Sequence, residues 1–140
     1  MSQFPQRHAI SRAQFFLELA KKCSAEQRNE FEAYLEAAII FARAALHRLQ
    51  SEYEKHPSWK NWWSSLLSDS AVQFFRDERN YILKEGPPKI GQIVRLGGEI
   101  PCTATELYYI ENPEVPAVVT VERHLASIKN LILQAQSLFT

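Results

Sequence analysis

The stretch that decides the fold runs from Ala25 to Tyr53 and reads AEQRNEFEAYLEAAIIFARAALHRLQSEY. Its apolar residues recur every three or four positions, as they do along one face of an α-helix. This stripe consists of Phe31, Leu35, Ala38, Ala42, Ala45 and Leu49, and it is widened by Ile39, Ile40, Phe41 and Leu46. A helix this long and this apolar is expected at the centre of a helical bundle. Pro57 ends it, because proline lacks an amide proton and clashes with the preceding turn.

Helical spacing also appears on both sides of this segment. A first amphipathic helix is expected from near Ser11, and Ser24 with Gln27 forms a capping-box pattern before the central helix. After Pro57, a short helix carries one apolar stripe of Trp59, Trp62, Trp63, Leu66 and Leu67, which is more typical of core packing than of a ligand platform. The last helix is expected from about Val121 to Leu138, with a buried stripe of Val121, Leu125, Ile128, Ile132, Ala135 and Phe139.

A fourth helix and a β excursion lie between these segments. Ser70 and Gln73 form a second capping-box pattern, and the helix that they open ends at Gly86. Residues 90–119 contain β-formers and a Gly-Gly pair suited to a tight turn, so they predict a small hairpin or flap, with a further extended piece over 117–121. The sequence therefore predicts one mostly α-helical domain over residues 1–140. Its expected architecture is an up-and-down bundle of four or five helices, with a small β-hairpin inserted before the last helix.

Composition limits the classes of function. Sixteen basic and sixteen acidic residues cancel, so any nucleic-acid site must be a local patch. The two cysteines, Cys23 and Cys102, lie far apart and lack metal-ligand spacing, which predicts no metal site, no cofactor and no disulfide framework. No apolar run reaches the roughly 18 residues of a membrane span, so the cytoplasm is the expected location and no membrane partner is expected.

The fourth helix carries the most informative residues. Its apolar arc contains Ala71, Val72, Phe74, Phe75, Ile82 and Leu83, yet Arg79 falls inside that arc and Glu78 lies at its edge. A charge without a partner is costly on such a surface. Glu78 and Arg79 are therefore expected either to join a structural ion-pair network or to line a cleft or subunit interface that binds an anion.

The run FRDERNYILKEGP over residues 75–87 resembles the signature helix of the HEPN superfamily, in which an arginine, commonly followed by Asn, His or Asp, precedes a histidine by a few residues. Arg79 and Asn80 fit this motif. The resemblance implies a homodimer that places an arginine and a histidine from each subunit across a shared groove, as in metal-independent ribonucleases. Arg79 would then hold phosphate, as the catalytic arginine if the domain is active, and Asn80 would orient Arg79 or bind the substrate.

The histidine of that motif is replaced here by Lys84. An amine with a pKa near ~10.4 is protonated at neutral pH and is a poor base, so Lys84 is expected either to hold phosphate or simply to suit the end of the helix dipole. The other histidines are His8, His47, His56 and His124, and none has the motif spacing. His47 could approach Arg79 across the bundle, but a lone helical histidine is more often structural or solvated, and no catalytic role is assigned to it.

Three functions follow from this interpretation. The preferred one is a non-catalytic or impaired HEPN-like domain that binds RNA, a nucleotide or a partner protein as a homodimer, with Arg76, Arg79, Asn80 and Lys84 as the ligand-binding residues. The second is an active metal-independent ribonuclease of toxin–antitoxin or defence type, whose partner would be a cognate antitoxin. The third is a purely structural interaction module that contacts its partner through residues 90–119.

Overall fold

The computed structural model describes residues 5–92 and 104–140. They form five α-helices and a small sheet: α1 (Pro5–Lys22), α2 (Arg28–Tyr53), α3 (Trp59–Ser65), α4 (Ser70–Lys84), β1 (Ile90–Gln92), β2 (Leu107–Tyr109), β3 (Asn112–Pro116) and α5 (Ala117–Phe139). A short 3-10 helix over Ala104–Glu106 precedes β2. The prediction of a mostly helical fold with β structure before the last helix is confirmed. Each helix in the described ranges is too short or too polar to span a lipid bilayer.

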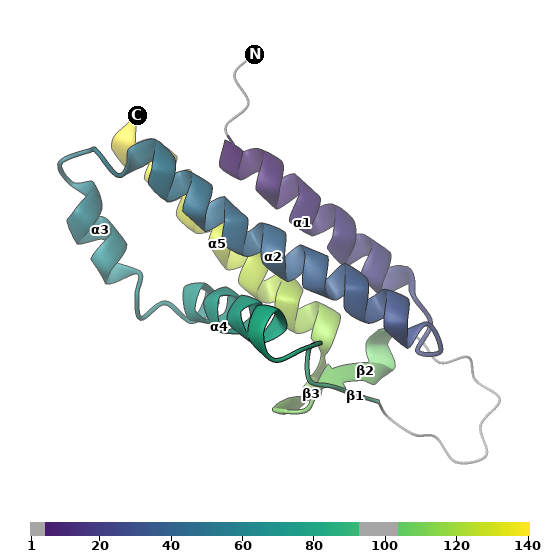
Figure 1. Cartoon of the computed structure of the whole chain (residues 1–140). Helices are drawn as coiled ribbons and strands as arrows, with labels where there is room; N and C mark the ends of the chain where they lie inside the picture. Colours follow the sequence, from purple (N-terminus) through teal and green to yellow (C-terminus); the bar gives the residue numbers. More distant parts are fainter. Residues whose placement is uncertain (1–4, 93–103) are drawn as a thin grey trace.

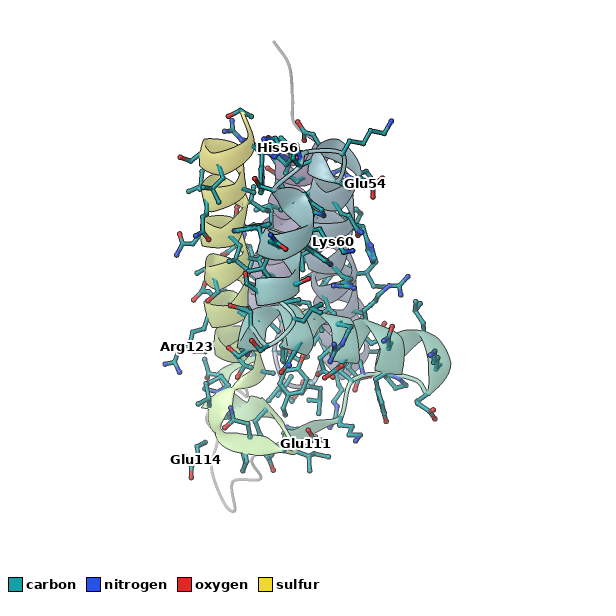
Figure 2. The ribbon with its side chains drawn as sticks, turned by 90° about the vertical axis from the view of Figure 1, so that its left-hand side faces the viewer. Glu54, His56, Lys60, Glu111, Glu114 and Arg123 are labelled. Atoms are coloured by element: carbon teal, nitrogen blue, oxygen red, sulfur yellow. The ribbon has the colours of Figure 1, made fainter. Side chains whose placement is uncertain are left out.

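Three long helices, α1, α2 and α5, lie side by side along one axis, and α4 crosses them rather than running along them (Figures 1 and 2). The up-and-down arrangement that the sequence predicts holds for α1 and α2, which run in opposite directions, but α5 runs in the same direction as α2 and α4 crosses the bundle (Figure 1). The end of α5 lies beside the end of α2 and near α3, whereas the sheet lies at the opposite end of the bundle (Figure 1).

The predicted stripe of α2 forms the middle of the core. All six of its members are buried, as are Ile39 and Leu46, while Ile40 and Phe41 are half-buried. The stripe of α5 is buried from Val121 to Ala135, and Phe139 is half-buried at its end. These apolar faces meet along the bundle, and their burial is the main stabilising contribution to the fold.

The tryptophans of α3 pack against the core, as their spacing predicts. Trp59 is buried, and its ring lies 5.5 Å from the ring of Phe139 and 5.3 Å from that of Trp63. Trp62 also contacts Phe139, with ring centroids 5.5 Å apart. Because Phe139 covers this aromatic cluster, the tryptophans leave less apolar surface for a partner than the sequence alone suggests.

Several predicted helix boundaries are wrong. The helix α1 begins well before Ser11, because residues from Pro5 onward already form helical turns that place Ala9 and Ile10 in the core. Residues 117–121 are helical rather than extended, since Ala117, Val118 and Val121 turn into the core at helical spacing. Leu83 was expected in the apolar arc of α4 but is 58% exposed, because the last turn of α4 extends beyond the other helices.

The cap of α4 also differs from the prediction. The side chain of Asp69, not Ser70, accepts hydrogen bonds from the backbone N–H groups of Ala71 and Val72, at 2.9 and 3.1 Å. Gln73 donates instead to the carbonyl of Leu67. At the other capping box, Ser24 donates its backbone N–H to the Gln27 side chain at 3.0 Å, but α2 begins only at Arg28.

The antiparallel sheet has the order β1-β2-β3, and Ile90 of β1 is paired with Tyr109 of β2. Gly91 faces Tyr108, whose ring carbon would lie 2.7 Å from a Cβ atom at position 91, so a larger residue there would require the Tyr108 side chain to move. Arg28 donates to the carbonyl of Ile90 and ties β1 to the start of α2. The predicted Gly-Gly turn at positions 97–98 and Cys102 lie outside the described residues.

Candidate functional site

The arginine that the sequence singles out lies on the face of α4 that packs toward α2. Arg76, Arg79 and Leu83 are spaced by three and four residues, so they share one face of the helix. Arg79 is half-buried, and its guanidinium donates to the Asn80 side chain at 3.4 Å, a long hydrogen bond between neighbouring residues. Arg76 pairs with Asp77 at 3.0 Å at the exposed edge of the same face.

Two residues of α2 complete this cluster. Arg43 and His47 are one helical turn apart, at positions i and i+4. Arg43 is half-buried; burial lowers its pKa, and the charges of Arg79 and Arg76 lower it further. His47 is also affected: partial burial lowers its pKa, and Arg43 and Arg79 add to the effect. We call Arg43, His47, Arg76 and Arg79 the basic face.

The basic face carries more positive charge than its surroundings neutralise. Within residues 5–92 and 104–140, no carboxylate forms an ion pair with Arg43 or Arg79. Glu78, the carboxylate next in sequence to Arg79, interacts electrostatically with Glu111, Tyr109, Lys89 and Asp77 instead. The structural ion-pair network between Glu78 and Arg79, which the sequence left open, is therefore not formed in the described part of the chain.

Other residues expected at the site lie around the basic face. Asn80 is half-buried and accepts the hydrogen bond from Arg79. Lys84 is exposed in the last turn of α4, one turn beyond Asn80, and the helical repeat turns it away from Arg79. Lys84 is thus a flanking cation, whereas Arg43, which the sequence analysis missed, lies at the centre. The only signal for Arg43 was an arginine four residues before His47 on a helix that is otherwise mostly apolar.

Chemically, the arrangement is suited to an anion. Arginine forks bind phosphate oxygens with two parallel hydrogen bonds, and like charges gathered without a counter-charge become more stable when an anion neutralises them. His47 remains neutral at neutral pH because its pKa is lowered, so one ring nitrogen can accept a proton. Among the described residues, no group of three or more His, Cys, Asp or Glu side chains is arranged to hold a metal ion.

Comparisons with known proteins do not add to this description. The sequence matches no known protein family model, and it shows no significant similarity to a curated protein or to a solved structure.

Proposed function

We propose that this chain is a HEPN-like domain that binds the phosphate groups of RNA or of a nucleotide through its basic face, as a homodimer and without cutting RNA. The observation that carries the proposal is that Arg43 and Arg79, from two helices, are both half-buried and near enough for their charges to interact, and neither has a carboxylate partner among the described residues. Keeping two guanidinium groups together in this way costs free energy unless an anion or water surrounds them.

The non-catalytic character follows from the position of the motif lysine. Lys84 stands where the motif has its histidine, and it is exposed at the end of α4. It flanks the basic face at the end of α4, so only a polyanion long enough to pass this end of the helix would also reach it. Leu83, which is 58% exposed beside the basic face, adds an apolar contact that fits a second copy of the chain.

Binding of a short single-stranded RNA carrying a fluorescent label, followed by anisotropy at low and at physiological salt, tests the proposal. We expect binding that weakens steeply with salt, because phosphate contacts release counterions. Arg43→Ala and Arg79→Ala should each weaken it by about tenfold, in line with charge-assisted hydrogen bonds of about 1.5–3 kcal/mol. Arg123→Ala is the matched control, because Arg123 is exposed on α5, away from this face (Figure 2).

Equal affinities of all three variants and of the unaltered protein would contradict the proposal, and so would the absence of any RNA or nucleotide binding. The second result would favour the structural interaction module, whose partner would contact the sheet region.

A metal-independent ribonuclease is the second candidate, and the position of His47 favours it. The lowered pKa keeps this imidazole neutral beside Arg43 and Arg79, so it could take a proton from a 2′-hydroxyl while the arginines hold the phosphate. In this case a toxin-like protein with a cognate antitoxin is expected. Cleavage of RNA by the purified protein without added metal, abolished by His47→Ala and by Arg79→Ala but not by His56→Ala, would establish this candidate over the non-catalytic one.

A further inference from the structure

A cavity of about 370 Å³ lies on the other side of α4 from the basic face. Its α4 residues, Phe74, Glu78 and Tyr81, are spaced by four and three positions, so they share a helix face roughly opposite to Arg76 and Leu83. The remaining walls come from the sheet region and from the first turns of α5. The volume lies within the range of small-molecule sites, roughly 300–1,000 Å³.

Aromatic rings form much of the wall. The His124 ring of α5 stacks on Phe74, with centroids 4.3 Å apart and an angle of 20° between the planes. Tyr109 of β2 meets Phe74 edge to face at 5.9 Å, and the ammonium of Lys89 lies 5.0 Å from the centre of the Tyr81 ring. The faces of such rings carry partial negative charge, which attracts cations.

Two buried polar groups of the wall lack a hydrogen-bond partner of ordinary geometry. Tyr109 is only 6% exposed, and its hydroxyl is unsatisfied among the described residues although it lies close enough to Glu78 for the two groups to affect each other's pKa. The hydroxyl of Thr120 in α5 is buried and unsatisfied as well. Buried polar groups are nearly always satisfied, so these two oxygens are where a ligand would form hydrogen bonds.

The charges around the cavity do not cancel. Glu111 pairs with Lys89 at 3.1 Å, and Asp77 pairs with Arg76 at 3.0 Å on its outer side. Glu78 is half-buried and has no ion pair among the described residues. Since His124 is neutral at neutral pH, because burial lowers its pKa, the wall keeps one carboxylate, Glu78, that forms no ion pair with any cation of the described residues.

We propose that this cavity binds a small organic cation, a primary amine carried on an aromatic or apolar body. Glu78 is its counter-ion, the hydroxyls of Tyr109 and Thr120 accept hydrogen bonds from the ammonium group, and Phe74, Tyr81 and His124 enclose the body. An anion would face Glu78, Glu111 and Asp77 together, and a neutral ligand would leave the charge of Glu78 uncompensated. This site does not depend on the basic face, so an experiment can contradict amine binding in the cavity without contradicting phosphate binding by the basic face, and the reverse.

Titration with phenethylamine, followed by isothermal calorimetry and by the NMR signals of the protein, tests the proposal. We expect the amine to bind, 2-phenylethanol to bind at least about tenfold more weakly, and 3-phenylpropionate not to bind, because only the first carries the cation that Glu78 requires. Glu78→Gln should reduce the affinity for the amine by about tenfold or more, and Tyr109→Phe by roughly threefold to tenfold.

Glu114→Gln is the matched control, because Glu114 is an exposed carboxylate of β3 outside the cavity wall (Figure 2). Thermal melting of each variant shows whether it folds. If Glu78→Gln does not fold, the amine affinity of Tyr109→Phe still tests the proposal. Equal binding of the amine and the alcohol would overturn the proposal, as would an amine affinity that survives both substitutions. Binding of phenethylamine that shifts NMR signals only outside the cavity would also overturn it.

Discussion

Glu78 shows how the surroundings of a single side chain change its pKa and thereby the stability of the fold. Burial raises the pKa of Glu78, and the nearby charges of Glu111 and Asp77 raise it as well, whereas the Tyr109 hydroxyl and Lys89 lower it. The folded chain therefore keeps the Glu78 proton to a higher pH than the unfolded chain does. Because the folded state binds more protons in this range, stability falls as the pH rises through the ordinary value of 4.5 and the raised value above it.

Glu78→Gln should therefore increase the free energy of unfolding at pH 7, because at this pH ionisation of the carboxyl group favours the unfolded chain. The increase should vanish at pH 4, where the carboxyl group is largely protonated in both states. Urea denaturation at the two pH values measures the difference, with Glu114→Gln as the control. A variant that is less stable than the unaltered protein at pH 7 would contradict the role of burial at this position.

The residues of the basic face also show the limit of sequence interpretation. Arg79 could be predicted because its position in the apolar arc of a helix conflicts with its charge. Arg43 could not, because its neighbours along α2 are ordinary for a helix and its proximity to Arg79 depends on how α4 crosses α2. The electrostatic interaction between these two arginines is a property of the tertiary structure, and no local sequence pattern predicts it.

At the scale of elements, the apolar repeat predicted the helices better than their ends. The stripes of α2 and α5 are long enough to define their buried faces without tertiary information. The position of a helix end depends on one or two hydrogen bonds, and the sequence offers two possible N-cap residues at the start of α4. Asp69 and Ser70 are both good N-cap residues, and the structure selects Asp69 because its extended backbone lets the carboxylate reach two amide groups.

Asp69→Ala should lower the free energy of unfolding by about 1 kcal/mol, because two N–H groups of α4 would lose their acceptor. Ser70→Ala is the matched control and should change stability little, since Ser70 is exposed in the first turn. Thermal or urea denaturation of the two variants distinguishes these residues. A larger loss for Ser70→Ala than for Asp69→Ala would show that the helix begins where the sequence alone placed its cap.

At the scale of the whole molecule, α4 separates two chemically different surfaces. One side carries the basic face against α2, and the other carries the acidic and aromatic cavity against the sheet and α5. The net charge of zero, summed over the whole chain, reveals neither surface. Composition therefore excluded an RNA-binding protein that is basic over its whole surface, but it could not reveal a local basic patch.

The oligomeric state belongs to this scale. We expect a homodimer in which Leu83 contributes to the interface, because this exposed apolar residue adjoins the basic face at the projecting end of α4. Leu83→Glu should shift the mass in sedimentation equilibrium toward that of a monomer, whereas Leu138→Glu, a substitution at an equally accessible leucine of α5, should not. A monomer before any substitution would contradict the expected homodimer while leaving phosphate binding by one chain open to test.

The central claim is that the basic face binds phosphate, and NMR of arginine and histidine side chains tests it most directly. On titration with a short single-stranded RNA, we expect the Nε–H signals of Arg43 and Arg79 to shift first. The pKa of His47 should rise, because a bound polyanion offsets the two positive charges that lower it. Unchanged signals from these three side chains at saturating RNA, with shifts confined to other parts of the chain, would contradict the claim.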